Sequence, residues 1–245
     1  MGRKAYPIPG PHYTHGFPAF FPEETVAMTR PARLTLAEEL VLLALDDKTG
    51  KVIDLPAFAL ESAIAAAIVM ELSLEGRIDT DPDKLWVVLS QMTEDPLLDS
   101  ALDQIVKEKA PQPAAHWLRR LARPELEDSV IARLVERGIV RAEEKRLLWV
   151  FKTRVYPPSS GIEEKEVRTR ILALLDSNDI PEARDALLVG LMRSSGILRR
   201  LLAPADYERL RERIDHLAQL EHVSRELSST LTELQVALAR TYVAG

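Results

Sequence analysis

The sequence predicts a mainly α-helical fold, in which one compact domain carries short β-hairpins. Three observations support this prediction. Apolar residues recur at helical spacing through most of the chain, and residues that cap helices or stop them bound these segments. The composition, with 46% hydrophobic and 29% charged residues, is typical of a globular protein with a buried core. The length of 245 residues suffices for one large domain.

The first helix begins at a recognisable signal. Thr35 and Glu38 form a capping box, and the apolar stripe that follows ends near Asp46. Val52 and Ile53 are expected to form a short strand. The further helices expected are Pro56 to Gly76, Asp99 to Lys109, Ala114 to Leu121 and Glu127 to Arg137, followed by helices from Pro158 to the end with breaks near 178–181, at Gly196 and at 203–204.

Residues 1–33 differ from the rest of the chain. They hold six prolines and several aromatic residues without a hydrophobic period, which predicts a disordered tail. The domain is therefore expected to span residues 34–245. Two alternatives concern the tail: its aromatic residues form a docking motif, or translation starts at Met28 and residues 1–27 are not made.

Two similar units follow the second and the fifth expected helices. Each helix stops at a glycine, Gly76 or Gly138, and a short strand and a charged turn come next. Each unit is then expected to end in a strand that carries tryptophan, Leu85 to Leu89 in the first and Leu147 to Phe151 in the second. In the second unit the charged turn is Arg141 to Arg146.

The sequence lacks the marks of several classes of protein. It has no cysteine, which excludes disulfides and thiolate metal sites, and no apolar run of about 18 residues that would span a bilayer. Without a signal peptide, the expected location is the cytoplasm. Phosphate loops, nucleophile elbows and paired metal ligands are absent, so we expect no enzymatic activity, no catalytic residues, no metal and no cofactor.

Charge is distributed unevenly along the chain. Residues 34–118 hold 6 basic and 16 acidic residues, whereas residues 119–170 hold 13 basic and 9 acidic residues. A basic segment of this kind can orient a protein toward an anionic partner, although solvated helix faces are an equally good explanation. Helix-plus-hairpin units also occur in winged-helix DNA-binding proteins. Because the first unit is acidic and the helix at Glu127 begins with two carboxylates, nucleic acid is not an expected partner.

The second hairpin is the most informative feature for function. Its apolar residues are Leu147, Leu148, Trp149, Val150 and Phe151, and the flanking cations are Lys145, Arg146, Lys152 and Arg154. A strand that is apolar on both faces is either buried in the core or offers one face to a partner or bilayer. Insertion of three such side chains would contribute roughly 5–8 kcal/mol, at about 1.5–3 kcal/mol each. Both readings, with Trp149 in the core or in a membrane, remain open.

Several segments, in order, resemble the Golgi phosphoprotein 3 family of peripheral membrane proteins and its bacterial members. They are Leu34 to Leu42, Met70 to Ile78, Leu97 to Leu102, Trp117, Leu134 to Ile139, Ala186 to Met192 and Leu201 to Pro204. The resemblance implies a compact helical domain that binds phosphatidylinositol 4-phosphate and serves as an adaptor for membrane enzymes. It also implies that Leu147 to Phe151 is an apolar hairpin for membrane insertion or self-association.

The family's headgroup residues do not carry over to this chain. Its tryptophan and three arginines fall on Pro56, Ala65, Pro124 and Glu127, none of which suits phosphate. Nearby Arg119, Arg120 and Arg123 are candidate replacements, from their position in the sequence alone.

The leading hypothesis is a non-enzymatic peripheral membrane protein. Its expected partners are an anionic phospholipid membrane, client membrane enzymes and further copies of itself, and its expected location is the cytoplasmic face of a membrane. The alternative is a soluble interaction module that oligomerises through the hairpin without lipid. A winged-helix-like DNA-binding protein is the weaker alternative.

Overall fold

The computed structural model describes residues 33–81, 83–147 and 151–219. The chain divides into two compact units, Met1–Arg33 and Leu34–Gly245, and the description below concerns the second. The predicted disorder of residues 1–32 lies outside the described residues, as does the helical pattern expected beyond residue 219.

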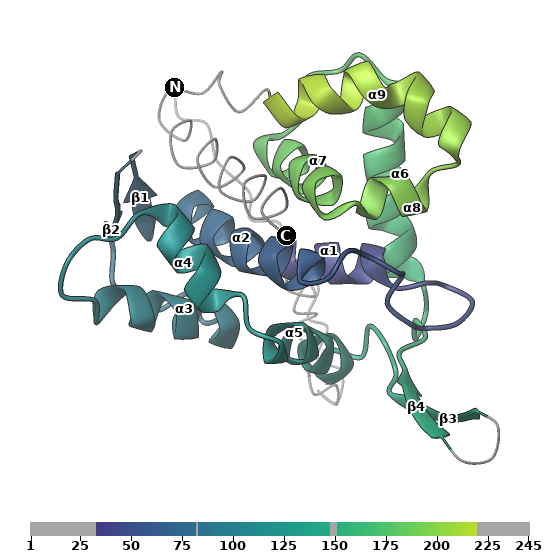
Figure 1. The fold of residues 1–245 in the computed structure, drawn as a ribbon, viewed down its shortest axis with the longest axis horizontal. Helices are drawn as coiled ribbons and strands as arrows, with labels where there is room; N and C mark the ends of the chain where they lie inside the picture. The colour runs from purple at the N-terminus through teal and green to yellow at the C-terminus, as the bar shows by residue number, and fades with distance from the viewer. Residues whose placement is uncertain (1–32, 82, 148–150, 220–245) are drawn as a thin grey trace, which may run out of the picture. The chain divides into compact units, whose positions relative to one another are not determined.

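The second unit is mainly helical, which confirms the predicted fold class (Figure 1). Antiparallel pairing joins β1 to β2 and β3 to β4. The elements of the described residues are α1 (Leu36–Ala44), α2 (Ala59–Leu74), β1 (Ile78–Thr80), β2 (Leu85–Val87), α3 (Pro96–Val106), α4 (Ala114–Leu121), α5 (Glu125–Glu136), β3 (Glu143–Leu147), β4 (Phe151–Val155), α6 (Ile162–Asp176), α7 (Ala183–Ser195), α8 (Ile197–Leu201) and α9 (Pro204–Gln219).

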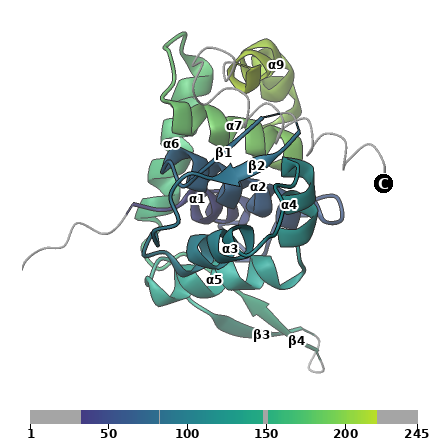
Figure 2. The same ribbon diagram turned by 90° about the vertical axis from the view of Figure 1, so that its left-hand side faces the viewer.

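Helix α2 is the centre of the core. It is apolar around most of its circumference, and a helix of that kind is stable only when other elements surround it. Four of the five residues from 63 to 67 are alanines, and these small side chains let neighbouring helices approach closely. Helices α3 to α5 cover one side of α1 and α2, and α6 to α9 cover the other (Figures 1 and 2).

The predicted capping box at the start of α1 is present. The Thr35 hydroxyl accepts a hydrogen bond from the Glu38 backbone N–H at 3.2 Å, and the Thr35 backbone N–H donates to the Glu38 carboxylate at 2.8 Å. These two bonds satisfy amides that have no partner inside the helix. The Glu38 carboxylate is also fully buried, so it needs further partners.

Those partners come from α5. An Arg137 guanidinium nitrogen lies 2.5 Å from one Glu38 oxygen, and Nε of Arg133 lies 3.4 Å from the other. Arg133 also contacts Asp95 at 2.8 Å. Asp95 caps α3, because its carboxylate accepts hydrogen bonds from the amides of Leu97 and Leu98. These ion pairs therefore hold the positions of α1, α3 and α5 together.

The buried neighbour of Glu38 makes a second set of ion pairs on the opposite side. Glu39 contacts Arg170 of α6 at 2.8 Å and Arg184 of α7 at 3.6 Å. Arg184 also contacts Glu71 of α2 at 2.5 Å, and Glu71 accepts a hydrogen bond from the Leu36 amide. Since buried charges are tolerated only when paired, these contacts fix α1 between the two groups of helices.

The structure corrects several expectations about the strands. The strand expected at Val52 and Ile53 is a single bridge between Val52 and Leu45. Residues 143–146, predicted as part of a charged turn, belong to β3, because they pair in antiparallel register with residues 152–155 of β4. The strand expected at Val140 is a single bridge to Pro158. In the first unit β2 ends at Val87, and the next two residues leave the ladder with exposed side chains, because both of their amides bond the Arg77 carbonyl.

Candidate functional site

The hairpin of β3 and β4 is anchored at its base. Val155, the last residue of β4, is fully buried. Beyond it the Tyr156 amide donates to the Gly50 carbonyl at 2.5 Å, and the Arg141 amide donates to the Pro157 carbonyl at 2.9 Å. The first bond ties the base of the hairpin to the loop after α1, and the second joins the two chain segments that flank the hairpin.

Glycine is required at this anchor. Gly50 has a φ of +67°, a conformation that other residues adopt at a cost. A Cβ at this position would lie 2.7 Å from the backbone nitrogen of Pro157. The close approach between the two loops therefore depends on the absence of a side chain at residue 50.

Leu147 and Phe151 form the last pair of the hairpin, at the end away from the base. The pairing begins with Glu143 opposite Val155 at the base and ends with Leu147 opposite Phe151. Four residue steps of about 3.3 Å place the last pair about 13 Å from the base. The ribbon extends away from α5 in both views (Figures 1 and 2).

The expected single strand from Leu147 to Phe151 is wrong, because Leu147 ends β3 and Phe151 begins β4. The residues that connect them, Leu148, Trp149 and Val150, lie outside the described residues. So do the side chains of Leu147 and Phe151. The register nevertheless places this apolar segment at the end of the ribbon opposite the buried base.

A second feature is a cavity of about 280 Å³ between α2, α3, α4 and α5. Apolar side chains form much of its wall, and charged or polar groups complete it. The lining residues are Ile68, Leu97, Ser100, Ala101, Gln104, Leu121, Arg123, Glu125, Leu126 and Ser129. Of the three arginines singled out in the sequence, only Arg123 lines this cavity.

The two charged residues of the cavity have opposite sign. Arg123 and Glu125 are both exposed at its rim. Within the described ranges, neither side chain forms an ion pair or hydrogen bond, either with the other or with a third residue. The cavity therefore presents one cation and one anion that are both available to a ligand. Sequence reasoning missed Glu125, because only the folded walls show that it shares a cavity with Arg123.

The other two candidate arginines lie on α4, outside the cavity. Arg120 pairs with Glu108 at 2.7 Å and stacks on the buried Trp117 ring at 5.2 Å. Arg119 is exposed. Because successive helical residues point about 100° apart, Arg119 and Arg120 do not converge on one point. The three arginines therefore do not form a single cluster.

Comparison with known proteins identifies the family. The family model described as Golgi phosphoprotein 3 (GPP34) matches residues 36–234. This chain belongs to the Golgi phosphoprotein 3 family. A similar protein is the vacuolar protein sorting-associated protein 74 of Eremothecium gossypii, which is 26% identical over 233 residues, covering 78% of this chain and 69% of that protein. Family membership confirms the resemblance drawn from the sequence.

Counting along the sequence places the headgroup pattern of the family on four positions, and none of them offers a cation in the structure. Pro56 and Pro124 are exposed, and Ala65 is fully buried in α2. Glu127 is half-buried near Glu61, so a second carboxylate stands beside the position at which the pattern has an arginine.

The environment of Glu127 changes its titration. Burial raises the pKa of its carboxyl above the ordinary value, and the negative charges of Glu61 and Asp128 raise it further. Each of these causes disfavours an additional negative charge. This part of the surface is therefore a poor site for a multiply charged phosphate.

Two further observations limit the chemistry of this Golgi phosphoprotein 3 relative. Across the described ranges, we find no cluster of three or more histidine, aspartate or glutamate residues that could hold a metal ion. The same residues contain no helix that is both long enough and apolar enough to cross a bilayer.

Proposed function

We propose that this protein is a non-catalytic peripheral membrane protein that attaches to an anionic membrane surface, at its cytoplasmic face, through the end of the β3–β4 hairpin. The observation that carries the proposal is the position of the segment Leu147 to Phe151. Leu147 and Phe151, which bound this segment, form the last pair of a ribbon whose base is anchored by Val155 and Gly50. Membrane attachment through such a hairpin fits the role of an adaptor that brings client enzymes to membranes, which the resemblance to the Golgi phosphoprotein 3 family implies.

The energetics favour attachment without a membrane-spanning segment. Trp149 and Phe151 would together contribute about 3–6 kcal/mol when their side chains leave water. Each cation of the hairpin near an anionic bilayer adds about 1 kcal/mol. Apolar insertion combined with basic residues is a sufficient two-part anchor for a peripheral protein.

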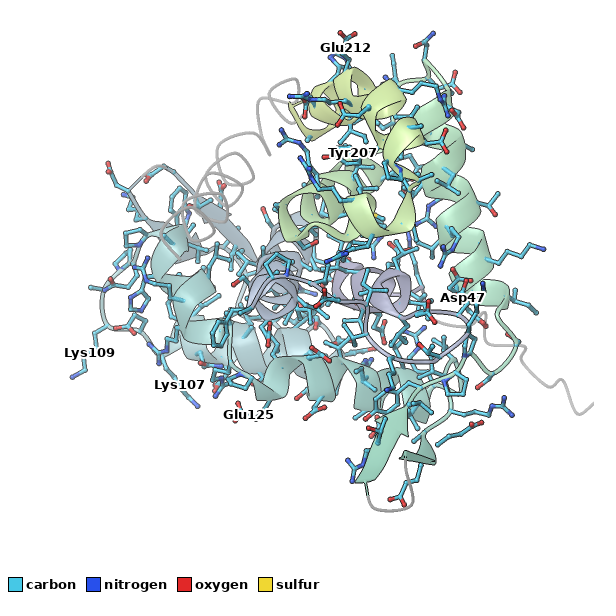
Figure 3. The ribbon with its side chains drawn as sticks, turned by 45° about the vertical axis from the view of Figure 1, so that its right-hand side comes forward. Asp47, Lys107, Lys109, Glu125, Tyr207 and Glu212 are labelled. Carbon is cyan, nitrogen blue, oxygen red and sulfur yellow. The ribbon has the colours of Figure 1, made fainter. Side chains whose placement is uncertain are left out.

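Glu125, at the rim of the cavity, begins α5, and the hairpin follows the other end of the same helix (Figure 3). Arg123, the candidate headgroup arginine that lines the cavity, is exposed and therefore accessible to a lipid headgroup. Arg119 would add a further exposed cation on α4.

Flotation with liposomes tests the proposal. The double substitution Trp149→Ala with Phe151→Ala should reduce recovery with vesicles that contain anionic lipid by at least about tenfold, because about 3–6 kcal/mol of insertion energy is lost. Ile180→Ala is the matched control, since Ile180 is 95% exposed in the loop between α6 and α7. Recovery of the double variant equal to that of the wild type would refute insertion.

The charge contribution needs a separate comparison. The double substitution Lys152→Gln with Arg154→Gln should lower recovery with anionic vesicles and leave recovery with neutral vesicles unchanged. Arg211→Gln on α9 should change neither recovery. Equal recovery of the wild type with neutral and anionic vesicles would contradict the electrostatic part.

Self-association through the hairpin is the second candidate, because an exposed two-stranded ribbon with an apolar end can also pair with another copy. Mass measurement in the absence of lipid separates the two functions. A wild-type oligomer that the hairpin double variant converts to a monomer, together with unchanged flotation, would favour the interaction module.

A further inference from the structure

We infer that the cavity between α2 and α5 binds a zwitterionic headgroup that carries both a phosphate and a primary ammonium, of the phosphoethanolamine type. The assignment of the lipid as its source rests on the proposed function. The binding chemistry itself rests on Arg123 and Glu125, which line the same cavity and are free of partners within the described part of the chain.

Arg123 supplies the phosphate-binding group. A guanidinium presents several N–H donors in a planar fork that matches phosphate oxygens. The backbone places this side chain at the rim, because the Arg123 amide bonds the Leu121 carbonyl just after α4 and Pro124 follows at once. Leu121 points into the same cavity, so the arginine stands above an apolar wall.

Glu125 gives the site its selectivity. Its carboxylate accepts hydrogen bonds from a primary ammonium, which has three N–H donors. The same carboxylate repels a ligand that carries only negative charge, and Glu127 and Asp128 in the same turn of α5 add to this repulsion. A phosphate without an amine therefore binds Arg123 but is repelled by the carboxylates in the first turn of α5.

The remaining lining suits a short polar ligand. Ser100 and Gln104 on α3 and Ser129 on α5 add hydroxyl and amide groups. Two of these are held in place, since Gln104 donates to the Ser100 carbonyl at 3.1 Å and Ser129 donates to the Glu125 carbonyl at 2.8 Å. The volume of about 280 Å³ lies just below the usual range for sites of drug-sized ligands, so the cavity accommodates a headgroup and not a whole lipid.

Calorimetric titration of the full chain with soluble probes tests the chemistry. Phosphoethanolamine should bind about tenfold or more tightly than glycerol 3-phosphate, which lacks the amine, and than ethanolamine, which lacks the phosphate. Phosphocholine should also bind more weakly, because its quaternary ammonium has no N–H to donate to Glu125. Equal affinity for phosphoethanolamine and glycerol 3-phosphate would overturn the inference.

Substitutions at the rim identify the role of each charge. Arg123→Gln should weaken phosphoethanolamine by about tenfold or more, and Glu125→Gln should do the same while leaving or raising the affinity for glycerol 3-phosphate. Lys109→Gln and Glu136→Gln are the matched controls, because both residues are exposed and neither lines the cavity. If the control variants lost as much affinity as the rim variants, specific binding by Arg123 and Glu125 would be contradicted.

Vesicles distinguish a lipid headgroup from a free metabolite. At constant anionic lipid, replacement of phosphatidylcholine by phosphatidylethanolamine should raise flotation of the wild type but not of Glu125→Gln. Binding of soluble phosphoethanolamine without this rise supports the site and assigns it a soluble ligand. The Trp149→Ala and Phe151→Ala double variant separates the two proposals. If it still binds phosphoethanolamine and floats as the wild type does, the hairpin proposal is overturned and the cavity assignment is supported.

Discussion

The substitution Glu38→Gln should destabilise the fold substantially, because it removes the buried charge that joins α1 to α5. The Glu38 carboxylate is fully buried and lies 2.5 Å from Arg137 and 3.4 Å from Arg133. Loss of one partner of a buried ion pair typically costs about 3–5 kcal/mol. Here both guanidiniums retain some exposure, 24% for Arg133 and 19% for Arg137, so water compensates for part of the loss.

We therefore expect a decrease of about 2–3 kcal/mol in the free energy of unfolding. Glutamine keeps an oxygen that can accept the Thr35 amide hydrogen bond, so the helix cap is largely preserved. For a domain of this size the loss corresponds to a decrease in Tm of about 4–12 °C. Urea titration followed by circular dichroism measures it directly.

Glu166→Gln is the control, because Glu166 is exposed on α6 and belongs to no ion pair among the described residues. Its effect should stay within about 0.5 kcal/mol. If Glu38→Gln also changed stability by less than about 0.5 kcal/mol, the reasoning about the buried charge would be refuted. A double-mutant cycle with Arg137→Met then measures how strongly the two residues are coupled.

Three further predictions concern single positions. Gly50→Ala should lower the free energy of unfolding by about 1–3 kcal/mol and increase hydrogen exchange of the β3–β4 amides. Gly76→Ala should lower it less, because Gly76 has a similar φ but open space around it. Equal losses of stability would contradict the role of the contact with Pro157. Because the pKa of Glu127 is raised on folding, the stability of the protein falls as pH rises from the ordinary carboxyl range toward that pKa. Glu127→Gln should therefore stabilise the protein at neutral pH and have little effect below pH of about 4. Unfolding measured at the two pH values checks this. Ala65→Arg should prevent folding, since Ala65 is fully buried, while Glu127→Arg should yield soluble protein; a folded Ala65→Arg variant would show that this headgroup position tolerates a cation after all.

The parts of the fold that depend on short stretches of sequence could be predicted. The capping box of Thr35 and Glu38 and the helix Ala114–Leu121 depend on residues within one or two turns, and both were predicted with the observed residues. The charged residues 143–146 were misread as a turn, because their pattern does not show that a basic strand will pair with them.

Features that join distant residues could not be predicted. Glu38 and Arg137 are 99 residues apart, and no local pattern relates them. The cavity is a similar case, since Arg123 and Glu125 are near each other in sequence but α2 and α3 provide the other walls. The apolar segment was recognised from its residues, whereas the place of Leu147 and Phe151 at the end of the ribbon away from its base required the register.

The two contacts of Arg133 have a consequence for ligand selection. Its guanidinium joins Asp95, at the start of α3, to Glu38 of α1, while α3 and α5 form two walls of the cavity. A movement of α5 that widened the cavity would leave a buried carboxylate without its cation, which is costly. We therefore expect the cavity to keep a constant width, so that the proposed ligands would be distinguished by the placement of their charges and not by closure of the protein around them.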